Sequence, residues 1–420
     1  MEGRHEQQPP EKPKQNQHQN PSLLLLPPSP HPADHAAVAA AYEPPIKAAI
    51  TKLRNEEHQS DRGLVLFVGV ASPVLAPTLA LTNPSPHQKS LSWPVAQSVL
   101  ARVYSIVAVI CARLSVPTEM HAGPDSVDVR VVFIHYEPSK SLAQDYRPAI
   151  DVNSTIIVDL PTFASTYHPW KQIFHVNSEP GNRLFISYMK IYERIQTLRQ
   201  DQLIVVESGL SLTEKSLPPT QTKLYSVVCL GGTFDHLHAG HKLLLTAAAI
   251  LLKVPVNRAA VPARFIIGIT GDELLKRKKY AEFVQSWDLR VTNVIEFLTT
   301  LLQLSKSGWT DPDVTKTDEK VIARFRDGAI EIHCVMLRDA FGPTTTEEEM
   351  DVLVVSGETR SGGDAVNSRR RELGWHELEI FEVDVLDAND SINGPTQTKK
   401  DFATKISSTA IRERKAEARK

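Results

Sequence analysis

One segment constrains the fold of this chain more than any other. Residues 231–241 read Gly-Gly-Thr-Phe-Asp-His-Leu-His-Ala-Gly-His, and they lie between an apolar run at 226–230 and an apolar helical pattern at 241–252. A short apolar run bounded by glycine predicts a buried strand, and glycine lets the backbone turn tightly and approach a ligand closely. A strand, a glycine-rich loop and a helix in this order favour an α/β unit that binds an anion where the helix begins.

The rest of the C-terminal half continues this alternation of strands and helices. Its further apolar runs, which predict strands, lie at 265–270, 330–337, 352–356 and 378–385. Helical patterns between and after them cover 284–302, 363–373 and the residues from 408 onward. Strands that are apolar on both faces are typical of a parallel sheet covered by helices. We therefore predict a Rossmann-like, doubly wound parallel sheet over residues 222–420, with ligands at the carboxyl ends of its strands.

The N-terminal half divides into a tail and a second domain. Residues 1–45 are rich in Pro, Gln and His and poor in aromatic residues, which predicts a disordered tail. Residues 46–215 predict a smaller α/β domain, in which we find no motif that carries chemistry. Its strands and one long helix are expected at 64–68, 95–114, 128–134 and 155–158. A proline-rich linker at 217–220 is expected to join the two domains.

The composition is that of an ordinary globular protein and excludes several classes. The formal net charge of −2 provides no global field that would attract nucleic acid or a membrane surface. The apolar run at 23–26 is far too short to span a bilayer. We expect three buried thiols rather than a disulfide or a metal site from the widely spaced Cys111, Cys229 and Cys334. These features predict an intracellular protein without a nucleic-acid partner, a membrane span or a protein-held metal.

Two histidines mark the start of the helix that follows the glycine-rich loop. His238 and His241 flank Gly240, where free backbone N–H groups and the helix dipole favour anions. Imidazoles at this point can donate hydrogen bonds to a phosphoryl group as its negative charge grows. The alternative interpretation is a glycine-rich turn with incidental histidines, which a lone histidine would have favoured.

A second segment near the C-terminus matches this phosphate chemistry. Residues 407–412 place serine and threonine hydroxyls at the predicted start of the last helix, with Arg412 one turn further on. Serine and threonine are also favoured N-caps, so the alternative interpretation is a well-capped terminal helix.

These segments resemble motifs of the nucleotidyltransferase superfamily. Residues 238–241 are similar to its H-x-G-H signature, and 406–412 resemble the I-S-S-T-x-x-R segment that holds the β- and γ-phosphates of a nucleotide. Two internal strings, 339–343 and 355–367, resemble the motifs D-x-[YF]-G-P and V-S-x-E-T-x-x-G-G-x-x-V-N of phosphopantetheine adenylyltransferases of the eukaryotic and archaeal type. The R-T-x-G string of cytidylyltransferases is absent.

The resemblance implies a reaction and a set of site residues. The reaction is the transfer of AMP from ATP to 4′-phosphopantetheine, which gives dephospho-coenzyme A and pyrophosphate. In it His241 would contact the α-phosphate, His238 would help to hold the same phosphates, and Thr233 would contact the phosphate of phosphopantetheine. Mg²⁺ is expected to bridge phosphate oxygens and to be held mainly by the substrates. The residues implied in binding ATP are Gly231, Gly232, Gly240, Gly357, Thr359, Ser407, Ser408, Thr409 and Arg412.

A basic run supplies a third expected catalytic group. The run consists of Lys276, Arg277, Lys278 and Lys279. The family places a lysine after a comparable Asp-x-Leu-Leu, so the resemblance implies that Lys276 contacts phosphate. A solvated helix face is the alternative interpretation, and which of the four side chains contacts phosphate stays open. The arginine of the bacterial enzyme is replaced by Ser356 here, with Arg360 as a candidate substitute.

Several questions stay open. The N-terminal half faintly resembles the domain before the adenylyltransferase in the bifunctional coenzyme A synthase, but the kinase loop G-x-x-x-x-G-K-[ST] is absent, so we expect the adenylyltransferase step alone. The alternatives are a nucleotidyltransferase for another phosphorylated small molecule, or a catalytically inactive nucleotide-binding scaffold, which the two intact histidines disfavour. We expect a cytoplasmic protein. A nuclear location, association with other enzymes of coenzyme A biosynthesis, feedback by coenzyme A, the oligomeric state and the role of residues 1–220 are not decided by the sequence.

Overall fold

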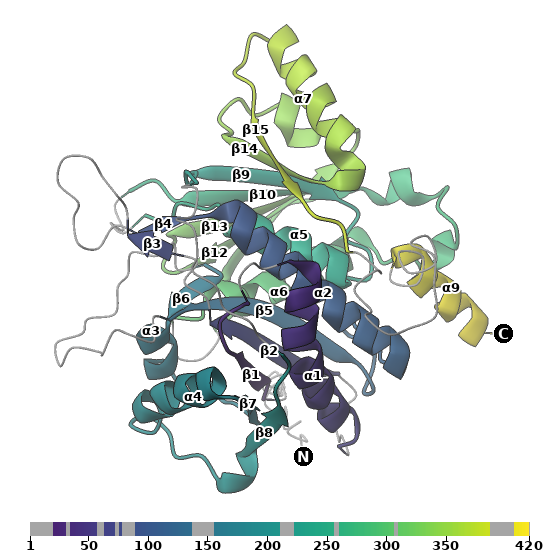
Figure 1. Ribbon diagram of the computed structural model, residues 1–420. Helices are drawn as coiled ribbons and strands as arrows, with labels where there is room; N and C mark the ends of the chain where they lie inside the picture. Colours follow the sequence, from purple (N-terminus) through teal and green to yellow (C-terminus); the bar gives the residue numbers. More distant parts are fainter. Residues whose placement is uncertain are drawn as a thin grey trace, which may run out of the picture.

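The computed structural model shows two α/β units, one on the other, with a helix from each packed between their sheets (Figure 1). These helices are α2 (Trp93–Leu114) in the N-terminal unit and α5 (Ala239–Ala249) in the C-terminal unit. The structure describes residues 20–30, 34–56, 63–71, 75–77, 89–136, 155–210, 222–255, 260–305, 310–386 and 407–419.

The N-terminal unit is built on a six-stranded parallel sheet with the strand order β6-β5-β2-β1-β7-β8. Its strands are β1 (Ser22–Leu26), β2 (Leu64–Ala71), β5 (Val127–His135), β6 (Ile157–Asp159), β7 (Ile173–Asn177) and β8 (Leu203–Glu207). The strands predicted at 64–68 and 128–134 are confirmed as β2 and β5. The strand order reverses between β1 and β7, so this sheet is doubly wound as well.

The prediction of a disordered tail over residues 1–45 is wrong for the second half of that segment. Strand β1 lies in the middle of the sheet, and helix α1 (His35–Arg54) crosses the domain boundary expected at residue 46. The leucines of β1 are at most 1% exposed, because pairing with β2 and β7 from distant parts of the chain buries them. The prediction rested on the average composition of residues 1–45, and a five-residue strand among prolines changes that average too little to be detected. Residues 1–19 and the predicted linker at 217–220 lie outside the described residues.

Packing also explains why α1 forms although Pro44 and Pro45 lie within it. A proline in a helix interior removes a hydrogen bond and usually costs about 3 kcal/mol or more. One side of α1 is nevertheless completely buried, with Tyr42, Ile46 and Ile50 all 0% exposed. The burial of this apolar side offsets the cost of the prolines.

The other helices of the N-terminal unit complete its layers. α1 and α2 pack against each other, and α3 and α4 pack against each other beside β6 and β7. The remaining elements are α3 (Leu160–Ser165), α4 (Glu179–Tyr192), the short helix η1 (Gln200–Gln202) and the antiparallel hairpin of β3 (Leu75–Pro77) and β4 (Lys89–Leu91).

The C-terminal unit confirms the predicted doubly wound sheet. Its five parallel strands follow the order β13-β10-β9-β14-β15. They are β9 (Val227–Gly232), β10 (Ala263–Thr270), β13 (Ile330–Leu337), β14 (Val352–Ser356) and β15 (Glu379–Val383). The order reverses between β9 and β14, and in such sheets ligands bind at the carboxyl ends of the strands at this switch point.

An antiparallel hairpin that the sequence did not predict extends this sheet beyond β13. It consists of β11 (Asp313–Lys316) and β12 (Lys320–Phe325). Strand β11 is exposed along its whole length and β12 alternates between buried and half-buried positions. Neither strand therefore has a continuous apolar run, which is the pattern from which the other strands of this sheet were predicted.

The helices of the C-terminal unit include three long ones besides α5. They are α6 (Trp287–Leu302), α7 (Arg360–Glu372) and α9 (Ser408–Ala418). Single-turn helices lie in the loops after β10, β13 and β14, namely η2 (Asp272–Leu275) and η3 (Ala281–Phe283), η4 (Gly342–Thr345), and η5 (Gly357–Thr359). Helix α9 packs beside η3 and so lies near the carboxyl end of β9.

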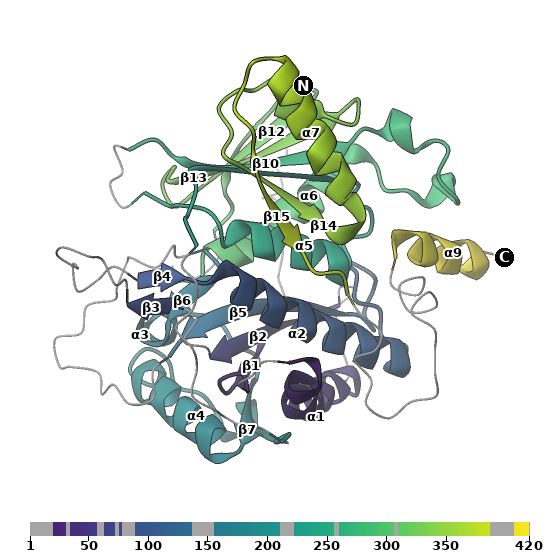
Figure 2. The same ribbon diagram turned by 45° about the horizontal axis from the view of Figure 1, so that its top comes forward.

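Helix α2 joins the two units. It packs against α1 and β5 of its own unit and against α5 and β15 of the other (Figure 2). It is the one helix in the described ranges that is long and apolar enough to cross a membrane, and 78% of its most apolar stretch is buried inside the protein. Contact with both units thus accounts for its composition. The three cysteines are also buried and unbridged, as predicted.

Candidate active site

The switch point of the C-terminal sheet brings the two predicted phosphate-binding segments together. Strand β9 ends at Gly232, and the loop at 233–238 leads from it to the start of α5. The start of α9, which the side chain of Ser407 caps, lies beside this loop. Ser408 and His238 are 170 positions apart in the sequence, yet Ser408 Oγ lies 3.2 Å from His238 Nε2.

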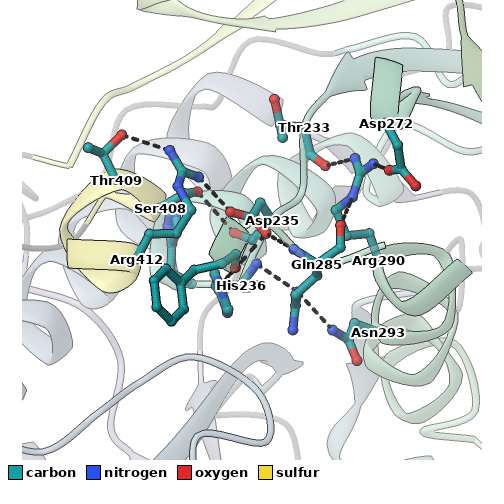
Figure 3. Close-up of polar contacts among 12 residues, drawn as sticks. Thr233, Asp235, His236, Asp272, Gln285, Arg290, Asn293, Ser408, Thr409 and Arg412 are labelled. Atoms are coloured by element: carbon teal, nitrogen blue, oxygen red, sulfur yellow. Dashed lines mark hydrogen bonds and ion pairs between the residues drawn. The ribbon is translucent and has the colours of Figure 1, made fainter. Parts of the chain in front are cut away.

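The loop has a strained backbone that its neighbours hold in place. Phe234 and His236 have φ angles of 53° and 47°, in the left-handed region that residues other than glycine rarely adopt. His236 N donates to Gln285 Oε1 at 2.8 Å, and its Nε2 lies 2.9 Å from Phe283 O. Gln285 N donates to Asp235 Oδ1 at 2.9 Å (Figure 3). Strain of this kind persists where the surroundings over-determine the backbone, and it clusters at functional sites.

His238 caps α5 and has both ring nitrogens engaged within the protein. Its Nδ1 accepts a hydrogen bond from Gly240 N at 3.2 Å. This cap requires the neutral tautomer with its proton on Nε2, so Nε2 donates to Ser408 Oγ. Ser408 Oγ in turn donates to Asp235 O at 2.9 Å. In this structure His238 therefore places α5 and α9 relative to the loop, and its contact with a phosphate stays a prediction.

His241 lies against His238 but lacks its partners. The two rings stack with their centroids 4.0 Å apart. His241 Nδ1 is buried and has no hydrogen-bond partner among the described residues. Burial lowers the pKa of His241 to about 4, and burial also holds the pKa of His238 well below its usual value, so both rings are neutral at pH 7. A buried polar atom without a partner marks a position where a ligand or water can bind.

A buried ion pair fixes α9 on the loop. Arg412 Nη1 donates to Asp235 Oδ2 at 2.6 Å, and the two side chains are 3% and 0% exposed. The other nitrogens of Arg412 donate to Lys279 O at 3.0 Å and to Thr409 Oγ1 at 3.1 Å. Hydrogen bonds of this kind are what a buried charge pair needs to be tolerated. Arg412 thus holds the terminal helix on the loop, and the grip on pyrophosphate that the resemblance implies stays a prediction.

Arg290 is a residue of the site that the sequence reasoning missed. Its side chain is completely buried in α6, donating from Nη1 to Thr233 O at 2.7 Å and from Nη2 to Asp272 Oδ1 at 2.6 Å (Figure 3). Its Nε donates to Gln285 O at 3.0 Å. Arg290 therefore supports the loop from the side opposite Arg412. A signal was present in the sequence, because position 290 falls in the apolar stripe of α6, where a charged residue is unexpected.

The glycines of the loop have two different local environments. A Cβ atom at Gly232 would lie 2.9 Å from the ring of Phe234, and one at Gly240 would lie 3.3 Å from the ring of His238. At Gly231 the nearest atom would be 3.6 Å away, which is an ordinary contact. Packing within the loop therefore accounts for glycine at positions 232 and 240. A close approach of ATP to Gly231, Gly232 and Gly240 stays a prediction.

The other expected site residues are more exposed. Lys276 is 67% exposed and its Nζ lies 2.5 Å from Glu273 Oε2, an arrangement typical of a solvated helix face. Gly357 and Thr359 form η5 at the carboxyl end of β14, next to β9. Thr359 Oγ1 accepts a hydrogen bond from Ser356 N at 3.1 Å.

The string at 339–343 forms a turn after β13. Asp339 Oδ1 accepts hydrogen bonds from Phe341 N at 2.8 Å and Gly342 N at 2.6 Å, and these donors hold the pKa of the carboxyl below its usual value. Gly342 has a φ of 49°, and a Cβ there would lie 2.1 Å from Leu337. The structure thus gives this string a role in shaping the turn.

The described residues also bear on metal binding. In the ranges that the structure describes, no group of three or more His, Cys, Asp or Glu side chains could hold a metal ion. The expectation that Mg²⁺ is held mainly by the substrates stays a prediction.

Comparison with known proteins gives separate matches for the two halves of the chain. A family model described as cytidylyltransferase-like matches residues 229–414, and one described as a domain of unknown function (DUF8446) matches residues 10–212. The chain is 33% identical over 202 residues to the phosphopantetheine adenylyltransferase of Saccharomyces cerevisiae, covering 48% of this chain and 52% of that protein. It is 36% identical over 189 residues to an uncharacterized protein of Schizosaccharomyces pombe, covering 44% and 47% of the two chains.

An archaeal relative is matched over more of its length. The chain is 30% identical over 190 residues to the phosphopantetheine adenylyltransferase of Pyrococcus horikoshii, covering 45% of this chain and 90% of the relative. The chain thus spans about half the length of the two fungal relatives and nearly the whole length of the archaeal one.

Proposed function

This chain belongs to the cytidylyltransferase-like nucleotidyltransferases, in the family of the archaeal phosphopantetheine adenylyltransferases, and we propose that it transfers AMP from ATP to 4′-phosphopantetheine. In this reaction an oxygen of the phosphopantetheine phosphate attacks the α-phosphorus of ATP. The bond between the α-phosphorus and the bridging oxygen breaks, and pyrophosphate leaves. No enzyme nucleophile takes part, so the protein contributes by positioning the substrates and stabilising charge.

The environment of His241 is the observation that carries this proposal. Its Nδ1 lacks a hydrogen-bond partner within the described ranges, whereas both nitrogens of the neighbouring His238 are engaged. The ring lies in the first turn of α5, where the helix dipole favours an anion. A neutral imidazole can donate a hydrogen bond to an oxygen of the α-phosphate, and this bond strengthens as negative charge develops there.

The names of the relatives support 4′-phosphopantetheine as the acceptor, because the yeast and archaeal proteins are both named for it. A different phosphorylated small molecule is the alternative within the family. A catalytically inactive scaffold is disfavoured by the strained loop and by the unpartnered nitrogen of His241. Mg²⁺ carried by the ATP phosphates and a cytoplasmic location belong to the same proposal.

The test is a comparison of acceptors with the full-length protein. Pyrophosphate release is measured with ATP and Mg²⁺ in the presence of 4′-phosphopantetheine, nicotinamide mononucleotide, phosphocholine or no acceptor. We expect release with 4′-phosphopantetheine alone. Release with another acceptor would keep the reaction type and replace the substrate. No release with any acceptor, from a folded protein that binds ATP, would favour the inactive scaffold.

A further inference from the structure

Three consecutive residues of the N-terminal domain contact three separate parts of the candidate active site. They lie at 118–120, just before β5, and we call them the 118–120 loop. Its partners are the first turn of α5, helix α9, and the strained loop at 233–238. The contacts join Thr118 O to Lys242 Nζ (2.7 Å), Glu119 Oε1 to Arg414 Nη2 (3.5 Å) and Met120 N to Leu237 O (3.2 Å).

Behind this loop lies a network of three buried charges that crosses the boundary between the domains. Lys242, the residue after His241, donates from Nζ to Asp128 Oδ1 of β5 at 2.6 Å. Asp128 Oδ2 also accepts a hydrogen bond from Arg130 Nη2 at 2.7 Å. The three side chains are at most 9% exposed. Arg130 donates in addition to Thr300 of α6, so the network reaches a second helix of the nucleotidyltransferase domain.

The charges in this network are mutually dependent. Burial alone would raise the pKa of Asp128, but Arg130 and Lys242 outweigh that effect and lower it to about 2, so the carboxylate is ionised. A buried lysine whose carboxylate partner is lost leaves an uncompensated charge in the interior. The first turn of α5 therefore has one favoured position, in which Lys242 reaches Asp128 and Thr118.

We propose that the N-terminal domain positions the active-site segments, and that Asp128 is a positioning residue that acts through Lys242 on His241. The inference rests on the proposed function, because it names the part of the chain that keeps the site in its working geometry. Lys242 adjoins His241 in the sequence, so a shift of the lysine displaces the imidazole. Displacement of a catalytic group by about 1 Å from a distant change can cost about 10²-fold in rate.

The test uses the full-length protein with Asp128→Asn, which keeps the shape of the side chain and removes its charge. We expect kcat for pyrophosphate release to fall about 10- to 100-fold, with a much smaller change in the KM for ATP. Amide hydrogen exchange at 237–242 should become faster in the free protein. A role in general stability alone would speed exchange across both domains and would leave the kcat of the folded fraction unchanged.

Tyr104→Phe is the matched control. Tyr104 is also buried in α2 and its hydroxyl lies 3.4 Å from Thr246 Oγ1, one turn further along α5 than Lys242. The same hydroxyl accepts a hydrogen bond from Val131 N of β5 at 3.3 Å, so this variant removes polar contacts to both α5 and β5. It leaves the three charges of the network in place, so we expect unchanged kcat and exchange. The proposal is overturned if folded Asp128→Asn matches this control in both measurements. If the wild type is inactive with every acceptor, the proposed reaction fails, and exchange at 237–242 still decides the positioning role.

A second variant covers the case in which Asp128→Asn does not fold. The double substitution Asp128→Asn with Lys242→Met removes the buried ammonium together with the carboxylate, so the network keeps its wild-type net charge, carried by Arg130. The amide oxygen at position 128 can still accept a hydrogen bond from Arg130, so we expect the double variant to fold. If Asp128 positions the site, exchange at 237–242 should stay fast and kcat should stay low in this double variant. Recovery of both to wild-type values would show that Asp128 only neutralises Lys242, and the proposal would be wrong.

Discussion

The two sheets of this protein share a topology and differ in what their switch points offer to a ligand. In each sheet the first strand, β1 or β9, is followed by a helix that begins at the carboxyl edge. The carboxylate of Asp34 caps α1, accepting a hydrogen bond from Ala37 N at 2.8 Å. The neutral ring of His238 caps α5. The segment between β1 and Asp34 contains four prolines, at 27, 28, 30 and 32, whereas β9 itself ends on two glycines.

This difference shows that topology alone does not make a phosphate site. An anion bound at a helix start needs free backbone N–H groups and no competing negative charge. Proline has no N–H group, and the Asp34 carboxylate already occupies the start of α1. The N-terminal sheet has the layout of a nucleotide-binding domain without the local chemistry. The contribution that we propose for the N-terminal unit to the candidate active site comes instead from the amino-end edge of its sheet, where the 118–120 loop precedes β5.

The largest effect on stability is expected when the buried ion pair of Arg412 and Asp235 in the C-terminal unit is broken. A surface ion pair of the N-terminal unit serves as the comparison. Arg412→Met should lower the free energy of unfolding by about 3–5 kcal/mol, because it leaves the Asp235 carboxylate buried and unpaired. Arg113→Met breaks the pair with Glu43, whose partners are 45% and 23% exposed, and should cost about 0–1 kcal/mol. Urea denaturation measures both. Similar losses would mean that Arg412 does not fix α9.

The next effect concerns catalysis. His241→Ala should lower kcat by about 10²–10³-fold, the usual cost of losing one oriented donor to developing charge. The melting temperature should change little, since the imidazole lacks a hydrogen-bond partner in the described part of the chain. Asn177→Ala, at the exposed end of β7 beside the N-terminal switch point, should leave kcat unchanged. A His241→Ala protein that keeps most of its activity would remove His241 from the mechanism.

The smallest effect is expected at the cap of α1. Asp34→Ala should lower the free energy of unfolding by about 1 kcal/mol, the typical cost of a lost N-cap. The KM for ATP and kcat should stay at their wild-type values, because the cap serves only the helix. Thermal melting and the pyrophosphate assay test the two parts separately. A clear change in the KM for ATP would show that the N-terminal switch point binds nucleotide after all, and the contrast between the two sheets would fall.

The strands of the C-terminal sheet could be predicted because each is a continuous apolar run between polar loops. Strand β13 was predicted to the residue at 330–337, since both of its faces are covered. Strand β1 was missed because five residues among prolines do not outweigh the composition around them. The hairpin of β11 and β12 was missed because its pairing at the sheet edge buries few side chains.

The site could be located from the sequence, but the partners of its side chains could not. The order of strand, glycine-rich loop and helix placed His238 and His241 at the start of a helix, a position that is typical of anion binding. The pairing of Arg412 with Asp235 spans 177 positions, and no local pattern reports such a contact. The same holds for Lys242, whose partner Asp128 belongs to the other domain. Lys276 looked like a phosphate ligand from its motif, and the structure places it at the surface beside Glu273.

The position of α2 between the two units has a consequence for how the chain is made. The ribosome adds the residues of β1 to β8 before those of α5, and until α5 has emerged the side of α2 that later contacts α5 lacks that partner. We expect the nascent N-terminal half to expose this apolar surface of α2 during synthesis, and we expect chaperones to bind it there. The cover arrives with the same helix that carries His241, so the end of this exposed stage coincides with the first step in the assembly of the candidate active site, and α9 completes the site later.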